Sequence, residues 1–271
     1  MDYSTNQTDT YGQATYLFTE VTQPMNTLYI TGAGVSVESG IPTFRGEDGF
    51  WTIGSKNHTP QEMATRSMYH NNPVEFLRWY YHRFATYRHH GPNDVHYWLA
   101  DKNLVTQNID GLDGKAGNSN YIAIHGRLDQ MTLYHNQEDS HAITPITTPW
   151  DQINESNLDQ SLVEIFNINC SQAKEYAPAL DVSYKPYVLL FDEYYTELYR
   201  ISAARQRMVE AERIIFMGTS FSVSITQIAL EIAINQNIPI EVVDPNPVNI
   251  PHPKVTYHKM KASKYIQLAN H

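Results

Sequence analysis

The sequence predicts an α/β protein in which helices cover both faces of a parallel sheet. Short apolar segments typical of buried strands alternate with helical segments along most of the chain. Most apolar segments end in polar or glycine-rich residues, as strands do at the ligand-binding edge of an open parallel sheet. Two stretches break this alternation, because the first is mostly helical and the second is polar and irregular. We therefore expect a Rossmann-like parallel sheet with helices on both faces plus a smaller lobe formed by two insertions.

Five segments are predicted to be strands of the sheet. They are TLYIT at 27–31, NLVTQNIDGL at 103–112, NYIAIHG at 120–126, RIIFMGTS at 213–220 and IPIEVVDPN at 238–246. Helices are predicted to open at VSVESG and at Thr59-Pro60, and to include NPVEFLRWYYHRFATYR and VSITQIALEIAINQ. All five strands lead into segments that should converge on one crevice.

The chain of 271 residues is long enough to bury a self-sufficient core. We expect a single unit over 1–271. Its large lobe comprises approximately 20–45, 91–126 and 185–271, and its small lobe approximately 46–90 and 127–184.

Composition excludes several classes of partner. A net charge of -10 argues against a nucleic-acid partner, and no apolar run approaches the length of a membrane-spanning helix. The polar N-terminal segment lacks the order of a secretion signal, so a cytoplasmic location is expected. Cys170 is the only cysteine, which rules out an intramolecular disulfide and a multi-cysteine metal site. The sequence makes no prediction of oligomeric state.

The turn after the first predicted strand suits a phosphate group. Gly32 and Gly34 permit a tight turn and let backbone amides approach a ligand, beside the positive end of the following helix. The usual dinucleotide fingerprint has a third glycine where this chain has Val37, so a plain tight turn stays an alternative. Asp244 suits ribose hydroxyls, and a helix cap or turn explains it equally well.

Six segments together resemble the sirtuin family of NAD-dependent protein lysine deacylases. They are GAGVSVESGIPTFRGEDGFW, TQNIDGL, HG, KPYVLLFDE, GTSFSV and VVDPN, in the family's order and spacing. The resemblance spans about 27–265, and its first two motifs are highly specific.

The resemblance implies that the cofactor is NAD. The positions that match its binding residues are Gly32, Ala33, Gly34, Ser36, Ile41, Phe44, Arg45, Gln107, Asn108, Asp110, Gly218, Thr219, Ser220 and Asp244. Among these, Arg45 would meet the phosphates, and Phe44 would shield the reacting ribose carbon. Family members usually carry asparagine at the position of Asp244. An aspartate there disfavours a 2′-phosphate, so NAD is expected rather than NADP.

The resemblance also implies catalytic roles for His125, Asn108 and Asp110. His125 would take a proton from a ribose hydroxyl after nicotinamide has left and the acyl oxygen of a modified lysine has attacked the ribose. Histidine suits this step because its unperturbed pKa is about 6.5. The acylated lysine of a protein or peptide is the expected partner, and the matching substrate-binding positions are Val188, Leu189, Phe191 and Tyr81.

The chain departs from the family's pattern on the substrate side. The two cysteine pairs that usually hold zinc are absent, and His135, Glu138, Asp139 and His141 are better explained as a polar loop than as a metal site. Asp192 replaces a glycine in the segment that normally pairs with the substrate peptide, where it adds a charge. Tyr81 resembles half of a tyrosine–arginine pair for acidic acyl groups, but Phe84 stands where the arginine would be, which makes succinyl-lysine specificity doubtful.

Three functions follow from these observations. The first is a zinc-free, sirtuin-type deacylase. The second is an NAD glycohydrolase or ADP-ribosyltransferase, in which water or a protein side chain intercepts the ribosyl cation. The third is a sensor of NAD or ADP-ribose without turnover. The combination of Asn108, Asp110 and His125 favours an enzyme, and His125 favours the deacylase.

Overall fold

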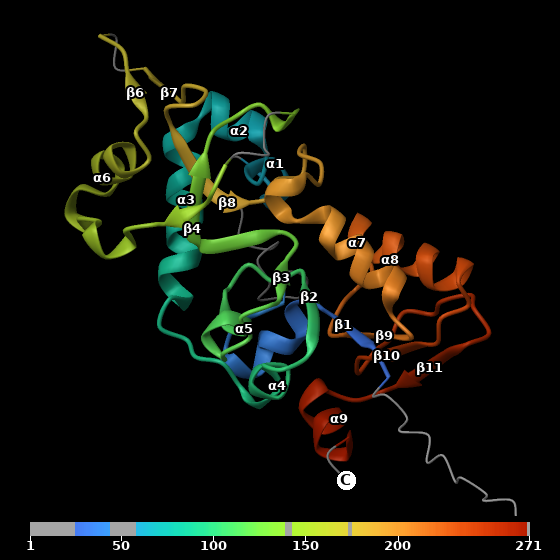
Figure 1. The fold of residues 1–271 in the computed structure, drawn as a ribbon. Helices are drawn as coiled ribbons and strands as arrows, with labels where there is room; N and C mark the ends of the chain where they lie inside the picture. The colour runs from blue at the N-terminus through green and yellow to red at the C-terminus, as the bar shows by residue number, and fades with distance from the viewer. Residues whose placement is uncertain (1–24, 44–57, 139–142, 173–174, 270–271) are drawn as a thin grey trace, which may run out of the picture.

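The computed structural model describes residues 25–43, 58–138, 143–172 and 175–269, shown in Figure 1. Its main sheet has six strands, all parallel, in the order β11-β10-β9-β1-β2-β3. The strands are β1 (Thr27–Thr31), β2 (Asn103–Thr106), β3 (Ile122–Ala123), β9 (Arg213–Met217), β10 (Ile240–Val243) and β11 (Val255–His258).

The strand order reverses between β1 and β9. From β1 the chain builds outward to β2 and β3, then returns to add β9, β10 and β11 on the other side. This is the order of doubly wound dinucleotide-binding sheets, in which a ligand crevice opens where the two halves diverge. The loops after β1 and β9 therefore meet at the switch point of the sheet.

Alternate residues of the strands point to two separate cores. Leu28 and Ile30 of β1 pack on one face with α7 (Ile201–Glu210) and α8 (Ser224–Asn235). Tyr29 points to the other face, which α4 (Asp94–Trp98) and α9 (Ala262–Ala269) cover. Because both of their faces are buried, β1, β9 and β10 are mostly apolar, as the sequence predicts.

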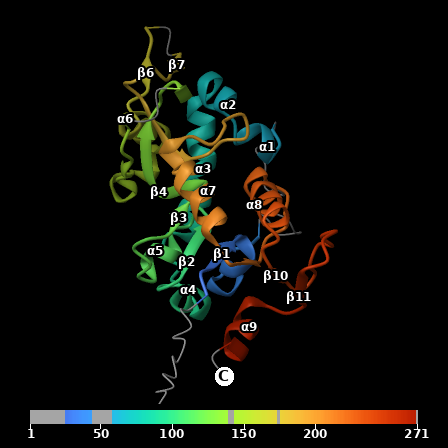
Figure 2. The same cartoon turned by 45° about the vertical axis from the view of Figure 1, so that its right-hand side comes forward.

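A second region lies at one end of the main sheet, opposite α9, in both Figure 1 and Figure 2. It contains an antiparallel sheet of β5 (Ile146–Thr147), β4 (Gly126–Leu133) and β8 (Tyr184–Val188), and a hairpin of β6 (Asn169–Cys170) and β7 (Tyr176–Ala177). Its helices are α1 (Pro60–Met63), α2 (Arg66–Asn71), α3 (Pro73–Tyr87) and α6 (Leu158–Ile165). Residues from these helices and from the antiparallel sheet form a third core that is rich in aromatic side chains.

The predicted fold class is confirmed, including the smaller region, while the lobe boundaries remain a prediction. The prediction that 127–184 is irregular is wrong, because this stretch contains most of β4 and several shorter elements. A sixth strand, β11, was not predicted. The helix expected at VSVESG is a 3-10 helix, η1 (Ala33–Ser39), and it ends at Gly40 in the left-handed conformation, with φ of 81°.

Helix starts agree well with the sequence. Thr59 caps α1 and forms a reciprocal capping box with Glu62, with Pro60 at the first helical position. The remaining elements are α5 (Leu112–Lys115) and the 3-10 turns η3 (Trp150–Gln152), η4 (Glu155–Asn157) and η5 (Glu197–Tyr199). In the part of the chain that the structure describes, every helix falls short of the length and apolarity that crossing a membrane requires.

Candidate active site

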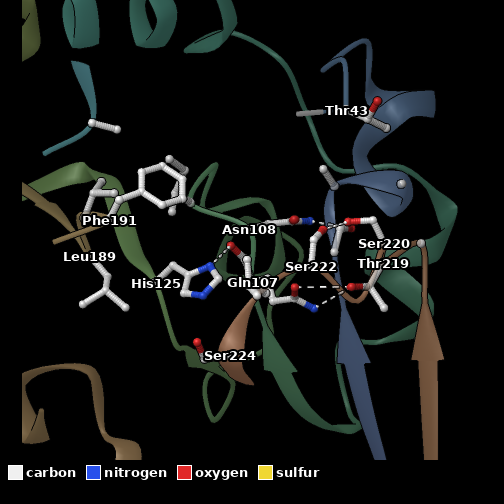
Figure 3. A pocket seen from close by; sticks show the side chains of 18 of the residues that line it. Thr43, Gln107, Asn108, His125, Leu189, Phe191, Thr219, Ser220, Ser222 and Ser224 are labelled. Carbon is white, nitrogen blue, oxygen red and sulfur yellow. Dashed lines mark hydrogen bonds between the residues drawn. The ribbon is translucent and has the colours of Figure 1, made fainter. Parts of the chain in front are cut away.

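The ends of the central strands surround a pocket of about 510 Å³. This volume falls within the range typical of small-molecule sites, roughly 300–1,000 Å³. Figure 3 shows His125 between Leu189 and Phe191 on one side and Gln107 and Thr219 on the other. The predicted site residues that line the pocket are Gly32, Ala33, Gly34, Gln107, Asn108, His125, Val188, Leu189, Phe191, Gly218, Thr219, Ser220 and Asp244.

The glycines at the switch point allow two backbone loops to touch. The amide of Gly32 donates to the carbonyl oxygen of Met217, and that of Gly34 donates to the carbonyl oxygen of Gly218, at 3.0 and 2.9 Å. A Cβ on Gly34 would lie 2.6 Å from the Cα of Gly218, whose own φ is +59°. These two amides are therefore already bonded within the protein. Neither glycine amide is free to bind a phosphate, and the two glycines serve close packing. Both glycines line the pocket, and a phosphate at this turn stays a prediction.

His125 follows β3 and begins the turn into β4. Its Nδ1 lies 3.0 Å from the carbonyl oxygen of Gln107, and its Nε2 lies 2.9 Å from the hydroxyl of Tyr195. A carbonyl oxygen only accepts, so Nδ1 carries the proton and Nε2 holds a lone pair. Burial lowers the pKa of His125 to about 4, against the hydrogen bond to Gln107, which raises it. The imidazole is therefore neutral at physiological pH.

A smaller pocket of about 40 Å³ adjoins the first and contains Ser36, Ile41 and Asp110. Ser36 Oγ donates to Asp110 Oδ2 at 2.7 Å and accepts from Asn108 Nδ2 at 3.1 Å. Behind it lies His96, a fully buried residue whose Nε2 is 3.4 Å from Ser36 Oγ. The amide of Asn93 donates to His96 Nδ1, so Nε2 bears the proton and donates to Ser36. Burial lowers the pKa of His96, while Asp110 raises it.

The carboxamide of Asn108 tests whether the pocket fits a polar ligand. Its Nδ2 donates to the carbonyl oxygen of Gly32 and to Ser36 Oγ, both at 3.1 Å. Its Oδ1 is buried and has no hydrogen-bond partner among the described residues. A buried acceptor without a donor is costly, and a ligand hydroxyl or amide would relieve that cost. The chemistry of the site therefore fits a ribose or a carboxamide.

Other predicted residues connect the loops. Gln107 Nε2 donates to the carbonyl oxygen of Thr31 and to Thr219 Oγ1, both at 3.1 Å, which ties together the ends of β1, β2 and β9. Asp244 lines the pocket, but its Oδ1 accepts from the amide of Asn246 at 2.8 Å. The turn interpretation of Asp244 is thus confirmed without removing it from the pocket wall. Phe44 and Arg45 lie outside the described residues.

The prediction that Tyr81 binds the substrate does not agree with its position in the structure. Tyr81 donates its hydroxyl to Glu155 Oε1 at 2.7 Å and is not among the residues that line the pocket. The preceding residue, Tyr80, lines it instead, together with Arg83. These two lie three positions apart on α3, so they share one helix face with Phe76, and this spacing is a signal that the sequence offered.

Arg83 brings a positive charge to the wall of both pockets. Its guanidinium lies 3.7 Å from the centroid of the Trp79 ring, and its Nη1 donates to the Trp79 carbonyl oxygen at 3.2 Å. Burial lowers the pKa of Arg83 to about 10, which still leaves it charged at neutral pH. Its stacking on Trp79 places a cation beside apolar residues of the pocket.

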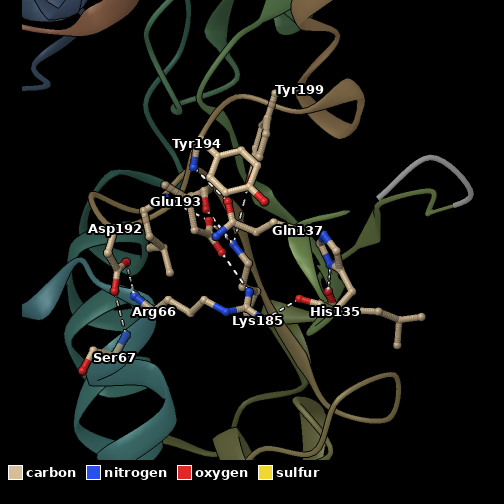
Figure 4. Close-up of polar contacts among 12 residues, drawn as sticks. Arg66, Ser67, His135, Gln137, Lys185, Asp192, Glu193, Tyr194 and Tyr199 are labelled. Atoms are coloured by element: carbon tan, nitrogen blue, oxygen red, sulfur yellow. Dashed lines mark hydrogen bonds and ion pairs between the residues drawn. The ribbon is translucent and has the colours of Figure 1, made fainter. Parts of the chain in front are cut away.

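The segment after β8 is tied to α2, as Figure 4 shows. Asp192 accepts from the backbone amides of Arg66 and Ser67 at 2.6 and 3.0 Å, so its carboxylate caps α2. Glu193 pairs with Arg66 at 3.2 Å and with the fully buried Lys185 at 3.0 Å. The carboxylate of Asp192 is therefore directed at a helix N-terminus. That a substrate peptide lies along this segment stays a prediction.

The residues present do not fit a structural zinc. The chain has one cysteine, and the described residues contain no group of three or more histidine, cysteine or acidic side chains placed to hold a metal. His135 Nδ1 is 2.7 Å from the carbonyl oxygen of Leu133, which gives it a local partner. Asp139 and His141 lie outside the described residues.

Together, the fold and the site define a doubly wound α/β protein whose main pocket lies at the switch point of its sheet. The model of the Sir2 family matches residues 32–225. The chain therefore belongs to the Sir2 family.

Two curated relatives are named as deacylases. The NAD-dependent protein deacylase of Leptospira interrogans is 30% identical over 212 residues, which cover 75% of each chain. The NAD-dependent protein deacylase 1 of Caldanaerobacter subterraneus is 43% identical over 109 residues, which cover 38% of this chain. That second match spans 43% of the relative's own length.

Solved structures share the fold. A Sir2 homologue in complex with NAD is 25% identical, with a TM-score of 0.66, over 89% of this chain and 86% of that chain. A mutant Sir2 homologue in complex with ADP-ribose has a TM-score of 0.69 at 24% identity, over 89% of each chain. The second likeness shows the fold alone.

Proposed function

We propose that this protein is an NAD-dependent lysine deacylase that transfers the acyl group of a modified protein lysine to ADP-ribose. The observation that carries the proposal is the neutral His125, whose Nε2 lone pair lies in a pocket at the switch point of the sheet. The names of the two deacylase relatives, and the solved complex of a Sir2 homologue with NAD, support the same activity. The cytoplasmic location expected from the sequence remains a prediction.

NAD supplies a glycosidic bond whose cleavage releases nicotinamide and leaves an electrophilic ribose carbon. Asn108 Oδ1 is the acceptor that would meet a ribose hydroxyl or the carboxamide, because it has no protein donor among the described residues. The Ser36–Asp110 pair at the smaller pocket would hold the nicotinamide end. Thr219, Ser220 and Asp244 would hold the adenosine half, on the side where β9 and β10 end.

His125 acts as the base. With Nδ1–H bound to the carbonyl oxygen of Gln107, its Nε2 would accept a proton from a ribose hydroxyl. That oxygen would then bond to the acyl carbon, the bond from this carbon to the lysine nitrogen would break, and the lysine amine would leave. The carbonyl partner fixes the tautomer and the ring plane, so the lone pair stays directed at the pocket. Simple hydrolysis of NAD by water, the reaction of a glycohydrolase, has less need of a base at the ribose hydroxyl.

The acyl chain lies, in this proposal, against Val188 and Leu128 beside Tyr80 and Arg83. Arg83 is 9% exposed, so a carboxylate that reached it would meet a poorly solvated guanidinium. This arrangement favours an acyl group with a terminal carboxylate, such as succinyl, over acetyl. The sequence argued against acidic acyl groups because it took Tyr81 as the tyrosine of the pair and found Phe84 at the position of the arginine. Tyr81 does not line the pocket, whereas Tyr80 and Arg83 do, so that argument no longer applies.

The test is to identify the products. The protein is incubated with NAD alone and with acetyl- or succinyl-lysine peptides, and O-acyl-ADP-ribose is expected only with peptide, and more with succinyl. His125→Ala should abolish acyl transfer and leave NAD affinity within about twofold, because the base acts after binding. Arg83→Met should reduce succinyl transfer more than acetyl transfer.

Two outcomes contradict the proposal. Free ADP-ribose formed equally with and without peptide indicates the glycohydrolase, and release of no nicotinamide in any tube indicates the sensor. Unchanged acyl transfer in His125→Ala removes this residue from the mechanism.

A further inference from the structure

The lone pair of His125 is already engaged by another side chain. The hydroxyl of Tyr195 lies 2.9 Å from His125 Nε2, and the two rings are nearly parallel, at 20°, with centroids 5.9 Å apart. Tyr195 also lines the main pocket. The contact therefore occupies the atom that would accept the proton in the proposed reaction.

The direction of this hydrogen bond follows from its neighbours. Nδ1 of His125 donates to the carbonyl oxygen of Gln107, so Nε2 of the neutral ring can only accept. The Tyr195 hydroxyl must then donate its proton to Nε2. The backbone of Ile225, in α8, bonds to the same hydroxyl and lowers its pKa, while the larger effect of burial raises that pKa to about 12. Tyr195 consequently keeps its proton at physiological pH.

The position of Tyr195 is set by the segment that precedes it. Glu193 is buried against Lys185 and also accepts from the amide of Leu190 at 3.1 Å, so the chain after β8 cannot shift freely. The adjacent Tyr194 is 54% exposed, and its amide donates to Gln137. Two neighbouring tyrosines of one segment thus have different surroundings, and only Tyr195 reaches the base.

We propose that Tyr195 is a positioning residue that holds the lone pair of His125 until a ribose hydroxyl of NAD replaces it. This inference rests on the proposed function, since it assigns His125 as the base. Before the cofactor binds, the ring is clamped at both nitrogens, by Gln107 and Tyr195. When the ribose hydroxyl arrives, the Tyr195–His125 bond breaks and a bond from the ribose hydroxyl to Nε2 forms in its place. Binding of NAD therefore costs one hydrogen bond within the protein.

Removing the hydroxyl should lift this cost. In Tyr195→Phe the hydroxyl that donates to Nε2 is gone, and a net hydrogen bond corresponds to roughly a threefold to tenfold change in an equilibrium constant. We expect the dissociation constant for NAD, measured by calorimetry, to fall by about threefold to tenfold in Tyr195→Phe. Tyr194→Phe is the matched control and should leave this constant unchanged.

A second measurement needs no cofactor. In the free protein, the titration of the His125 ring is followed by NMR in the wild type and in Tyr195→Phe. The groups that act on this ring are Gln107, Tyr195 and the apolar surroundings, which lower its pKa by burial. A neutral imidazole that loses its donor is less stable, so the pKa of His125 should rise in the variant.

The outcomes separate the two proposals. An unchanged pKa of His125 in Tyr195→Phe overturns the inference, whether or not the protein deacylates lysine. Loss of kcat with unchanged NAD affinity also overturns it, because Tyr195 would then pass a proton during the reaction. Absence of acyl transfer in the wild type overturns the proposed function and leaves the NMR result valid.

Discussion

At the scale of the residue, the burial of His125 determines its protonation state and its strength as a base. Burial lowers its pKa to about 4, so the ring is neutral and able to accept a proton at physiological pH. A base of such low pKa is weak, because proton transfer is most efficient when the pKa lies near the working pH. In the proposed exchange, the lone pair on His125 Nε2 changes its hydrogen-bond donor from Tyr195 to a ribose hydroxyl only when NAD is bound.

Asp113 is a residue whose charge should contribute to the pH dependence of stability. It is 1% exposed in α5, and burial, together with the charge of Asp110, raises its pKa to about 7. The folded state therefore binds a proton that the unfolded state has already lost between about pH 4 and pH 7. The contribution of Asp113 to stability is present at about pH 4 and is lost as the pH rises through 7.

The variant Asp113→Asn tests this. Its free energy of unfolding, relative to that of the wild type, should increase between pH 4 and pH 7 by up to about 4 kcal/mol and then stay level. Denaturant titrations across this range measure the difference. Asp151→Asn is the matched control, because it makes the same exchange of carboxylate for amide at an exposed position. A constant difference at every pH would show that Asp113 does not titrate in this window.

At the scale of elements, the chain after β8 joins the substrate side of the pocket to α2. Lys185 Nζ donates to the carbonyl oxygen of Val188 at 2.8 Å and forms an ion pair with Glu193. Glu193 forms a second ion pair with Arg66. Arg66 in turn lies 4.2 Å from the centroid of the Tyr134 ring. A buried ionic group of this kind is poor evidence for high stability, but removing one member leaves an uncompensated charge. This ionic group of Lys185, Glu193 and Arg66 keeps the intervening segment, with Leu189 and Phe191, in place on the pocket wall.

The cap that Asp192 supplies to α2 can be measured. Asp192→Ala removes acceptors for two amides and a negative charge at a helix N-terminus, so the free energy of unfolding should fall by about 1 kcal/mol. Asp192→Asn retains one acceptor oxygen and should lose less. Equal stability of the wild type and Asp192→Ala in urea titrations would contradict the capping role.

At the scale of the whole molecule, aromatic packing holds the smaller region together. The third core joins Tyr69, Phe76 and Phe166, which are fully buried, to the antiparallel sheet. Tyr69 and Phe76 have centroids 5.0 Å apart, and Tyr69 and Tyr134 are 5.1 Å apart. Such aromatic pairs each contribute about 1 kcal/mol beyond their buried area.

Metal removal should therefore have no effect on stability. A structural zinc site contributes on the order of 10 kcal/mol in small zinc-dependent domains, so its loss would unfold this region. We expect the same melting temperature with and without a strong chelator, and less than one zinc per chain by elemental analysis. A stoichiometric metal, or a clear fall in melting temperature with the chelator, would contradict this prediction.

Much of the main sheet was predictable, because its signals are local. The strand predicted at 27–31 and the helical segment predicted at 72–88 coincide with β1 and α3 to within a residue at each end, and the Thr59-Pro60 signal marks α1. β11 and β4 were missed for a common reason. β11 reads as VTYH and β4 as GRLDQMTL, which mix polar with apolar residues, so their pairing depends on partners far away in sequence.

The site divides in the same way. The sequence by itself determined which loops meet, since glycines and polar residues at the ends of parallel strands must gather at one edge of the sheet. Only the tertiary structure decided what each group does there. It turned the amides of Gly32 and Gly34 toward β9, directed Asp192 at α2, and placed Tyr195 on His125. The direction of a hydrogen bond depends on three-dimensional neighbours, and those neighbours are set by long-range packing that no local pattern records.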